Sequence, residues 1–199
     1  MCRGTLRRNH DLGCASAFPG LHPAIPVTLY TVTPDRMNMH NGAPVTINAK
    51  YVHTNLIAQD WRSLARFYQE IFGCSPVPPE RDFRGSSLDV ATGLAEAHLT
   101  GVHLRLPGYE DGGPTLEIFN YEVLEKRVPT AINRPGFGHI AFAVDDVASA
   151  RDTLLQAGGR GIGDIVAFRT TDGRRVTWCY VTDPEGNVIE LQSWSEEGR

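Results

Sequence analysis

One pattern of apolar and polar positions organises residues 136–159. Apolar side chains alternate with other residues from His139 to Val144, which predicts a strand with one buried face. From Asp146 to about residue 157, apolar positions recur at helical spacing, and Asp146 is suited to cap the start of that helix. This stretch therefore predicts a strand followed by an amphipathic helix.

A second copy of this pattern begins at His53. Asp60 stands seven residues after His53, as Asp146 stands seven residues after His139. Asp60 is expected to cap a helix that ends near residue 72, and a glycine follows at the matching place in both copies. The shared order of histidine, cap, helix and glycine indicates an internal repeat.

Each copy is followed later by a strand that carries one glutamate between aliphatic neighbours. Glu117 lies in the expected strand 115–121, and Glu190 lies in the expected strand 188–194. The chain is therefore expected to hold two similar modules joined by a linker. We place the first module at residues 47–121, the linker at 122–135 and the second module at 136–195. All three belong to a single domain, 47–195.

Shorter patterns predict the remaining elements. Residues 86–94 favour a short helix, and residues 97–106 alternate as a strand. Prolines at positions 76, 78 and 79 indicate the edge of a loop. In the second module, the Asp172-Gly173 dipeptide predicts a hairpin between strands near 164–169 and 175–182.

The first 46 residues differ from the rest because they contain several prolines and keep neither a helical nor a strand period. We expect a disordered extension there. Arginines near the start are not followed by an apolar segment, so the pattern does not indicate a secretory signal. We assign no chemistry to this part of the chain.

Composition and charge narrow the classes of function. The net charge of −4 offers no basic surface for nucleic acid, and no apolar run is long enough to span a membrane. Four cysteines lack the spacing of a disulfide framework or a zinc site, which favours reduced thiols. We expect a cytoplasmic globular protein that acts on a small molecule, without nucleic-acid or membrane partners.

The strand patterns also place the repeated histidines and glutamates. If the aliphatic neighbours of each residue pack on helices, the four side chains all face the other side of their sheets. Taken singly, such a histidine is usually structural and such a glutamate usually faces solvent. Two carboxylates beside two imidazoles are instead understandable when a divalent cation neutralises them. The predicted ligands of one ion of Zn, Ni, Co, Mn or Fe are His53, Glu117, His139 and Glu190.

These residues and their order resemble the vicinal-oxygen-chelate superfamily, which includes glyoxalase I, methylmalonyl-CoA epimerase, extradiol dioxygenases and bleomycin-resistance proteins. The most specific motif is Asp-Pro-Glu-Gly-Asn-Val-Ile-Glu-Leu at residues 183–191, and the resemblance runs from about residue 49 to 194. It implies an α+β fold in which two βαβββ modules form curled mixed sheets around a metal site.

The ligand pattern separates members of that superfamily. Extradiol dioxygenases leave the position of Glu117 free, and methylmalonyl-CoA epimerases usually have glutamine there. The filled set of two histidines and two glutamates is similar to bacterial glyoxalase I. That enzyme typically binds glutathione through an arginine and an asparagine, where this chain has Ile57 and Tyr121. The resemblance therefore does not support glutathione as the substrate.

The resemblance implies a metal-dependent isomerase, epimerase or lyase that moves an α-proton through a metal-bound enolate. Glu190 is our first candidate for the catalytic base and Glu117 the second. Candidate substrate-binding residues are Asn55, His103, Arg105, Tyr121 and Trp194. The alternatives are an extradiol-type non-haem Fe(II) dioxygenase and a metal-free drug-binding resistance protein. Whether the site lies within one chain or across a homodimer stays open.

Overall fold

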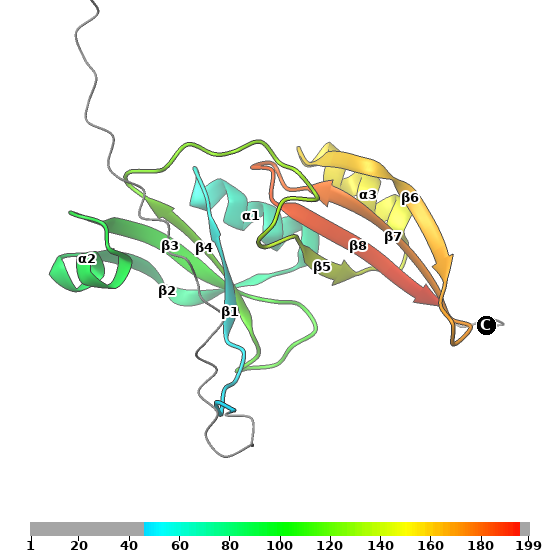
Figure 1. The fold of residues 1–199 in the computed structure, drawn as a ribbon, viewed down its shortest axis with the longest axis horizontal. Coiled ribbons are helices and arrows are strands. Elements are labelled where there is room, and N and C mark those ends of the chain that lie inside the picture. Colours follow the sequence, from blue (N-terminus) through cyan, green and yellow to red (C-terminus); the bar gives the residue numbers. More distant parts are fainter. Residues whose placement is uncertain (1–45, 196–199) are drawn as a thin grey trace, which may run out of the picture. The chain divides into compact units, whose positions relative to one another are not determined.

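Each module folds into one four-stranded mixed sheet with a helix between its first two strands (Figure 1). The computed structural model describes residues 46–195. The expected extension at residues 1–46 lies outside the described residues, apart from its last position. The elements of the first module are β1 (His53–Ile57), α1 (Trp61–Phe72), β2 (Ser75–Arg84), α2 (Ser86–Thr92), β3 (His98–Arg105) and β4 (Thr115–Tyr121). Those of the second are β5 (Ile140–Ala143), α3 (Val147–Gln156), β6 (Arg160–Arg169), β7 (Arg175–Thr182) and β8 (Val188–Ser195).

The two sheets have the same topology. Their strand orders are β1-β4-β3-β2 and β5-β8-β7-β6. In each sheet the first strand of the module runs parallel to the last, and the other pairs are antiparallel. The expected α+β class and the internal repeat are therefore confirmed, and both sheets remain open.

The predicted helix caps are present. Asp60 accepts a hydrogen bond from the backbone N–H of Ser63 at 3.0 Å, and Asp146 accepts one from Ser149 at 2.7 Å. Each carboxylate satisfies an amide that the first turn of its helix leaves without a partner. The first helix ends at Gly73, whose φ of 70° is the left-handed conformation that glycine adopts most easily.

The prediction of a loop edge at the three prolines was wrong, because all three lie in β2. This strand is at the edge of its sheet, where a missing N–H donor is tolerated, and its pairing with β3 is irregular between Val77 and Arg81. The equivalent edge strand β6 begins at Arg160, earlier than the expected 164, and is irregular between Ile162 and Val166. The short helix α2 is confirmed.

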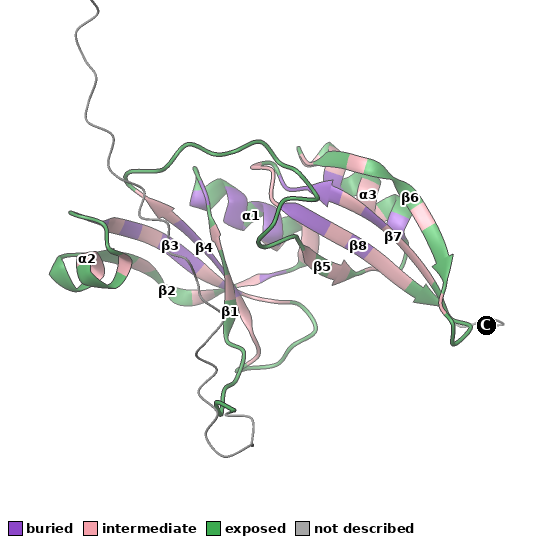
Figure 2. Cartoon of the chain, in the orientation of Figure 1, coloured by how far each residue is buried: buried purple, intermediate pink, exposed green. Residues whose placement is uncertain are grey.

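One apolar core joins α1 and α3 to both sheets (Figure 2). The rings of Phe72 in α1 and Phe142 in β5 stack with centroids 3.9 Å apart. The hydroxyl of Tyr68 donates to Asp183 of the second module at 3.0 Å. Fully buried members include Leu64, Leu104, Leu116, Ile118, Leu154, Ile189 and Leu191. Burying each such side chain contributes about 1.5–3 kcal/mol.

No helix among residues 46–195 has the length and apolar character needed to cross a membrane.

Candidate metal centre

Glu117 is the most buried of the four predicted metal ligands, with 8% of its surface exposed. It lies in the middle of β4, between β1 and β3. One carboxylate oxygen is 3.2 Å from Nε2 of His53 and accepts a hydrogen bond from Nδ2 of Asn55, also at 3.2 Å. The other is 2.8 Å from Nε2 of His103. Three side chains from two neighbouring strands therefore hold this carboxylate.

His103 faces Glu117 because the two residues are direct cross-strand partners in β3 and β4. Its second ring nitrogen, Nδ1, lies 3.1 Å from the hydroxyl of Thr115. Burial lowers the pKa of His103, and the charge of Glu117 opposes that effect. The resulting preference for a neutral ring suits a residue that donates one hydrogen bond to the carboxylate.

The second module forms a similar but sparser pair. Nε2 of His139, immediately before β5, is 3.2 Å from Oε2 of Glu190 in β8. Tyr180 in β7 is the cross-strand partner of Glu190, and its ring centroid is 5.1 Å from that of His139. Burial raises the pKa of Tyr180, as do the charge of Glu190 and a hydrogen bond to it. Tyr180 thus stays a neutral hydrogen-bond donor to the carboxylate.

Tyr180 is the residue of this site that sequence reasoning missed. A signal was available, because Tyr180 occupies in β7 the place that His103 occupies in β3. In both modules that place lies opposite the glutamate of the last strand. Extending the repeat comparison to the third strand of each module would have identified it.

The structure brings the predicted ligands together in two pairs. His53 adjoins Glu117, and His139 adjoins Glu190, but residues 46–195 hold no group of three or more histidine, cysteine, aspartate or glutamate residues arranged to bind a metal. Each pair offers one imidazole nitrogen and one carboxylate oxygen. That donor chemistry suits a divalent metal, and each pair is therefore a half-site.

The other predicted site residues lie in different surroundings. Arg105 forms an ion pair with Asp111 at 2.6 Å. Trp194 is 46% exposed, with the guanidinium of Arg174 4.8 Å from its ring centroid. Tyr121 is half-buried at the end of β4. Within residues 46–195, none of these three side chains has a described contact with Glu117 or Glu190. They are therefore not part of either half-site.

A cavity of about 290 Å³ adjoins both modules. Asn55 and His139 line it together with Arg134 of the linker and with Phe137, which follows the linker. Phe137 is 98% exposed although it stands two residues before His139. The cavity gives a small molecule access to the half-site of the second module.

Comparison with known proteins agrees with this architecture. Residues 50–191 match the model of the Glyoxalase/Bleomycin resistance protein/Dioxygenase superfamily. The chain is 31% identical over 159 residues to the lactoylglutathione lyase of Schizosaccharomyces pombe, covering 74% of this chain and 48% of that protein. It is 28% identical over 147 residues to a probable lactoylglutathione lyase of Vibrio parahaemolyticus, covering 72% and 90%. The chain thus spans about half the length of the yeast relative.

A solved structure shows the same fold. It is a glyoxalase family protein from Bacillus cereus, which superposes with a TM-score of 0.57 at 18% identity and covers 77% of this chain and 97% of its own. Two open mixed sheets built from repeated modules define the vicinal-oxygen-chelate class of domain. The chain belongs to the glyoxalase/bleomycin resistance/dioxygenase superfamily.

Proposed function

We propose that the protein is a metal-dependent enzyme that moves an α-proton of a carbonyl substrate, as an isomerase, epimerase or lyase. One observation carries the proposal: repeat-equivalent positions of the two modules each pair a histidine Nε2 with a glutamate oxygen at 3.2 Å. The names of the yeast and Vibrio relatives support the lyase form of this chemistry.

His53, Glu117, His139 and Glu190 would hold one divalent ion. When bound, it would supply Lewis-acid polarisation of a substrate carbonyl, which lowers the pKa of the α-proton. The chain's own residues then divide the remaining work. Glu117 is fixed by His53, His103 and Asn55, so its role is to hold the ion.

Glu190 is the stronger candidate for the base that takes the α-proton. Its side chain is 17% exposed, against 11% for Glu117, and only His139 and Tyr180 contact it among the partners described. A carboxylate with fewer fixed donors can turn towards a substrate proton more readily. Tyr180 orients it by donating a hydrogen bond from its neutral hydroxyl.

The complete site would form in a homodimer, where the first half-site of one copy meets the second half-site of its partner. The two half-sites of one chain do not combine into a metal-binding group within residues 46–195. Large apolar side chains are also exposed in the linker and just after it, around the cavity that His139 lines, among them Val128 at 61% and Phe137 at 98%. Such a patch suits a protein partner, and a second copy would cover it while completing both sites.

Mixing two inactive variants tests this assembly. His53→Ala and His139→Ala each spoil both sites of their own homodimer. A mixed dimer would contain one site with both defects and one intact site. Each mixed dimer should therefore recover up to half of the metal content and activity of the unchanged dimer. Two variants that stay inactive after refolding together, while forming mixed dimers by native mass spectrometry, would contradict the exchange of half-sites.

The reaction class is tested separately. Metal analysis of the purified protein comes first, followed by α-proton exchange in D₂O with hemithioacetals of 2-oxoaldehydes and with acyl-CoA thioesters. We expect exchange with at least one of these classes. Ring cleavage of a catechol under O₂ by the Fe(II)-loaded protein, without exchange, would instead establish the dioxygenase alternative. Tight drug binding by metal-free protein, again without exchange, would establish the resistance-protein alternative.

A further inference from the structure

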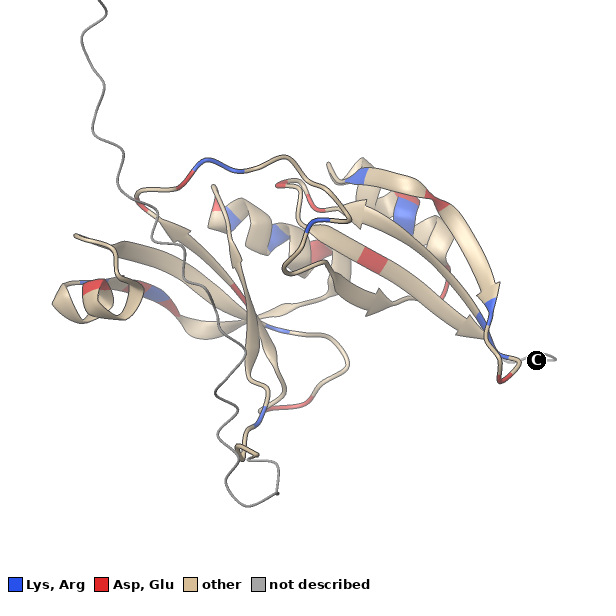
Figure 3. Ribbon diagram, in the orientation of Figure 1, with Lys and Arg blue, Asp and Glu red and all other residues tan. Residues whose placement is uncertain are grey.

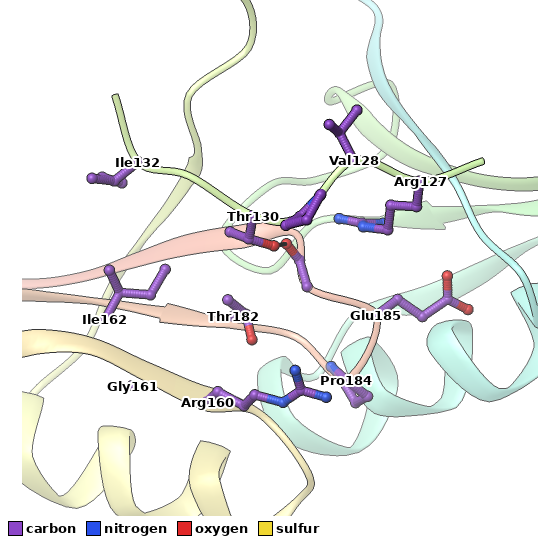
Figure 4. A pocket seen from close by; sticks show the side chains of 12 residues that line it. Arg127, Val128, Thr130, Ile132, Arg160, Gly161, Ile162, Thr182, Pro184 and Glu185 are labelled. Atoms are coloured by element: carbon purple, nitrogen blue, oxygen red, sulfur yellow. Dashed lines mark hydrogen bonds between the residues drawn. The ribbon is translucent and has the colours of Figure 1, made fainter. Parts of the chain in front are cut away.

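A second cavity, of about 480 Å³, contains none of the four predicted metal ligands (Figure 4). It is lined by the linker, by the start of β6 and by the turn between β7 and β8. We propose that this cavity binds a small organic anion, with a carboxylate or phosphate group and an apolar portion. The inference does not depend on the proposed reaction.

Two arginines give the cavity its charge. Arg127 comes from the linker and Arg160 from the first position of β6, and Figure 4 shows their side chains extending towards the cavity from different segments. Within residues 46–195, the side chain of Arg160 has no hydrogen bond or ion pair, although its backbone pairs with Thr182 in the sheet. Arg127 donates only to the neutral side-chain oxygen of Asn187, at 3.2 Å. Neither guanidinium forms an ion pair with a described carboxylate, although the charge of Arg127 lowers the pKa of the buried Asp183. Both guanidinium groups therefore keep donors for an anion.

The single acidic side chain in the described wall of the cavity is Glu185. Its carboxylate accepts hydrogen bonds from the backbone N–H groups of Gln59 and Asp60, at 2.8 and 2.9 Å. Figure 4 shows it turned away from Arg160. Glu185 therefore binds the backbone that leads into α1 and does not pair with either arginine of the cavity.

Thr182 supplies a polar group without a protein partner. The residue is 5% exposed and lines the cavity, but its hydroxyl makes no hydrogen bond within the described structure. An unsatisfied buried hydroxyl is costly. Rotation about its Cα–Cβ bond would present the hydroxyl to a ligand oxygen, which would give the group the partner it lacks.

The rest of the wall determines the kind of anion. Its apolar members are Val128, Pro129, Ile132, Ile162 and Pro184. A volume of about 480 Å³ exceeds the needs of an inorganic oxyanion and lies in the range of small-molecule sites. Arginine forks bind carboxylate and phosphate in two-point geometry. The cavity therefore fits an oxyanion that carries a hydrocarbon portion.

Calorimetric titration of the full chain with hexanoate and hexyl phosphate tests the site. Either anion should bind, with inorganic phosphate weaker and hexanol silent, and the two organic anions distinguish a carboxylate ligand from a phosphate ligand. Arg160→Gln should weaken binding about tenfold or more, because it removes charge-assisted hydrogen bonds. Arg175→Gln, which changes an exposed arginine at the other end of the β6–β7 pair, should leave affinity unchanged.

Two further variants distinguish binding in this cavity from binding elsewhere on the protein. Thr182→Val should raise the melting temperature, since an unpartnered hydroxyl is removed, and yet weaken anion binding. His139→Ala should lose metal but keep anion affinity, which excludes binding to the metal. Two results would overturn the proposal. One is that neither organic anion binds at about 20 mM, a concentration well above the millimolar Kd of a weak site. The other is that the Arg160→Gln and unchanged proteins bind the anions with equal affinity.

Discussion

The two modules have the same backbone plan, but they hold their glutamates differently. Glu117 has His103 opposite it in β3 and Asn55 opposite it in β1, and both contact it. The equivalent neighbours of Glu190 are Tyr180 and Ala141, and alanine offers no polar contact. The repeat thus preserves the histidine–glutamate pair while the surroundings differ, which suits one fixed carboxylate and one freer carboxylate.

The surfaces around the glutamates differ as well. Gly101 in β3 and Trp178 in β7 occupy equivalent places, two residues before His103 and Tyr180. Few charged residues lie on these two strands (Figure 3). Phe119 lies opposite Gly101, whereas Gln192 lies opposite Trp178. A large ring therefore comes from the last strand in one module and from the third strand in the other. The two half-sites would present different walls to a substrate.

The largest expected effect concerns the two glutamates. Glu190→Gln keeps the size of the side chain and one acceptor oxygen but loses most of its basicity. Activity per bound metal should fall by ~10²–10⁴-fold, the usual contribution of a general base. Glu117→Gln should be milder, because that carboxylate is fixed by three donors. Initial rates and metal content of both variants provide the measurement. A larger loss for Glu117→Gln would assign the base to the first module.

The next comparison concerns the histidines. His139→Ala removes a predicted ligand, whereas His103→Ala removes a group that contacts Glu117 without being a predicted ligand. Loss of a supporting partner typically weakens metal binding by ~10–100-fold, and loss of a ligand should weaken it further. Competition with a chelator measures both affinities. Equal losses would mean that His103 belongs to the ligand set.

The third comparison concerns Gly101. A Cβ at this position would lie 2.2 Å from the carbonyl oxygen of Ile118 and 2.3 Å from the ring of Phe119. Gly101→Ala should therefore lower the free energy of unfolding by roughly 3 kcal/mol or more. Gly138→Ala is the control, since nothing lies within 4 Å of its added Cβ. Urea denaturation that gives similar values for both variants would show that β3 and β4 separate easily.

Much of this architecture could be predicted from local signals. Asp60 and Asp146 indicated two helix starts because a capping carboxylate acts within its own first turn. The histidine–glutamate pairs were expected because strand alternation fixes which face a side chain occupies. Both relations depend on neighbours in sequence or on the repeat, and neither needs knowledge of long-range packing.

Other features depend on contacts that local patterns do not encode. The prolines at 76, 78 and 79 are compatible with β2 only because that strand is at a sheet edge, and edge position follows from the pairing of distant strands. The pairing of His103 with Glu117 depends on the register of β3 against β4. Whether the four predicted ligands meet at one metal ion depends on how the two half-sites are brought together. Strand patterns in the sequence do not determine that arrangement.

The smallest expected effect concerns the buried carboxylate of Asp183 in the second module. Among the described residues, the first module has no equivalent of it. Asp183 stands seven residues before Glu190, and its counterpart in the first module, Glu110, is exposed in a loop. Asp183 is 1% exposed and accepts hydrogen bonds from Tyr68 at 3.0 Å and from the backbone and side chain of Asn187 at 2.8 and 2.7 Å. Burial raises the pKa of Asp183, although these hydrogen bonds oppose the effect.

A raised pKa means that the folded state binds this proton more tightly than the unfolded state. The contribution of Asp183 to stability is therefore greatest in acid and decreases as pH rises from about 3.8 through the raised pKa. Asp183→Asn should remove that decrease. Asp172→Asn is the contrasting control, because hydrogen bonds to Thr170 and Arg174 lower the pKa of Asp172 to about 2. Its contribution is instead lost as pH falls below about 3.8. Urea titrations between about pH 2 and 8, which span both transitions, give both slopes. An unchanged slope in Asp183→Asn would show that this buried carboxylate titrates normally.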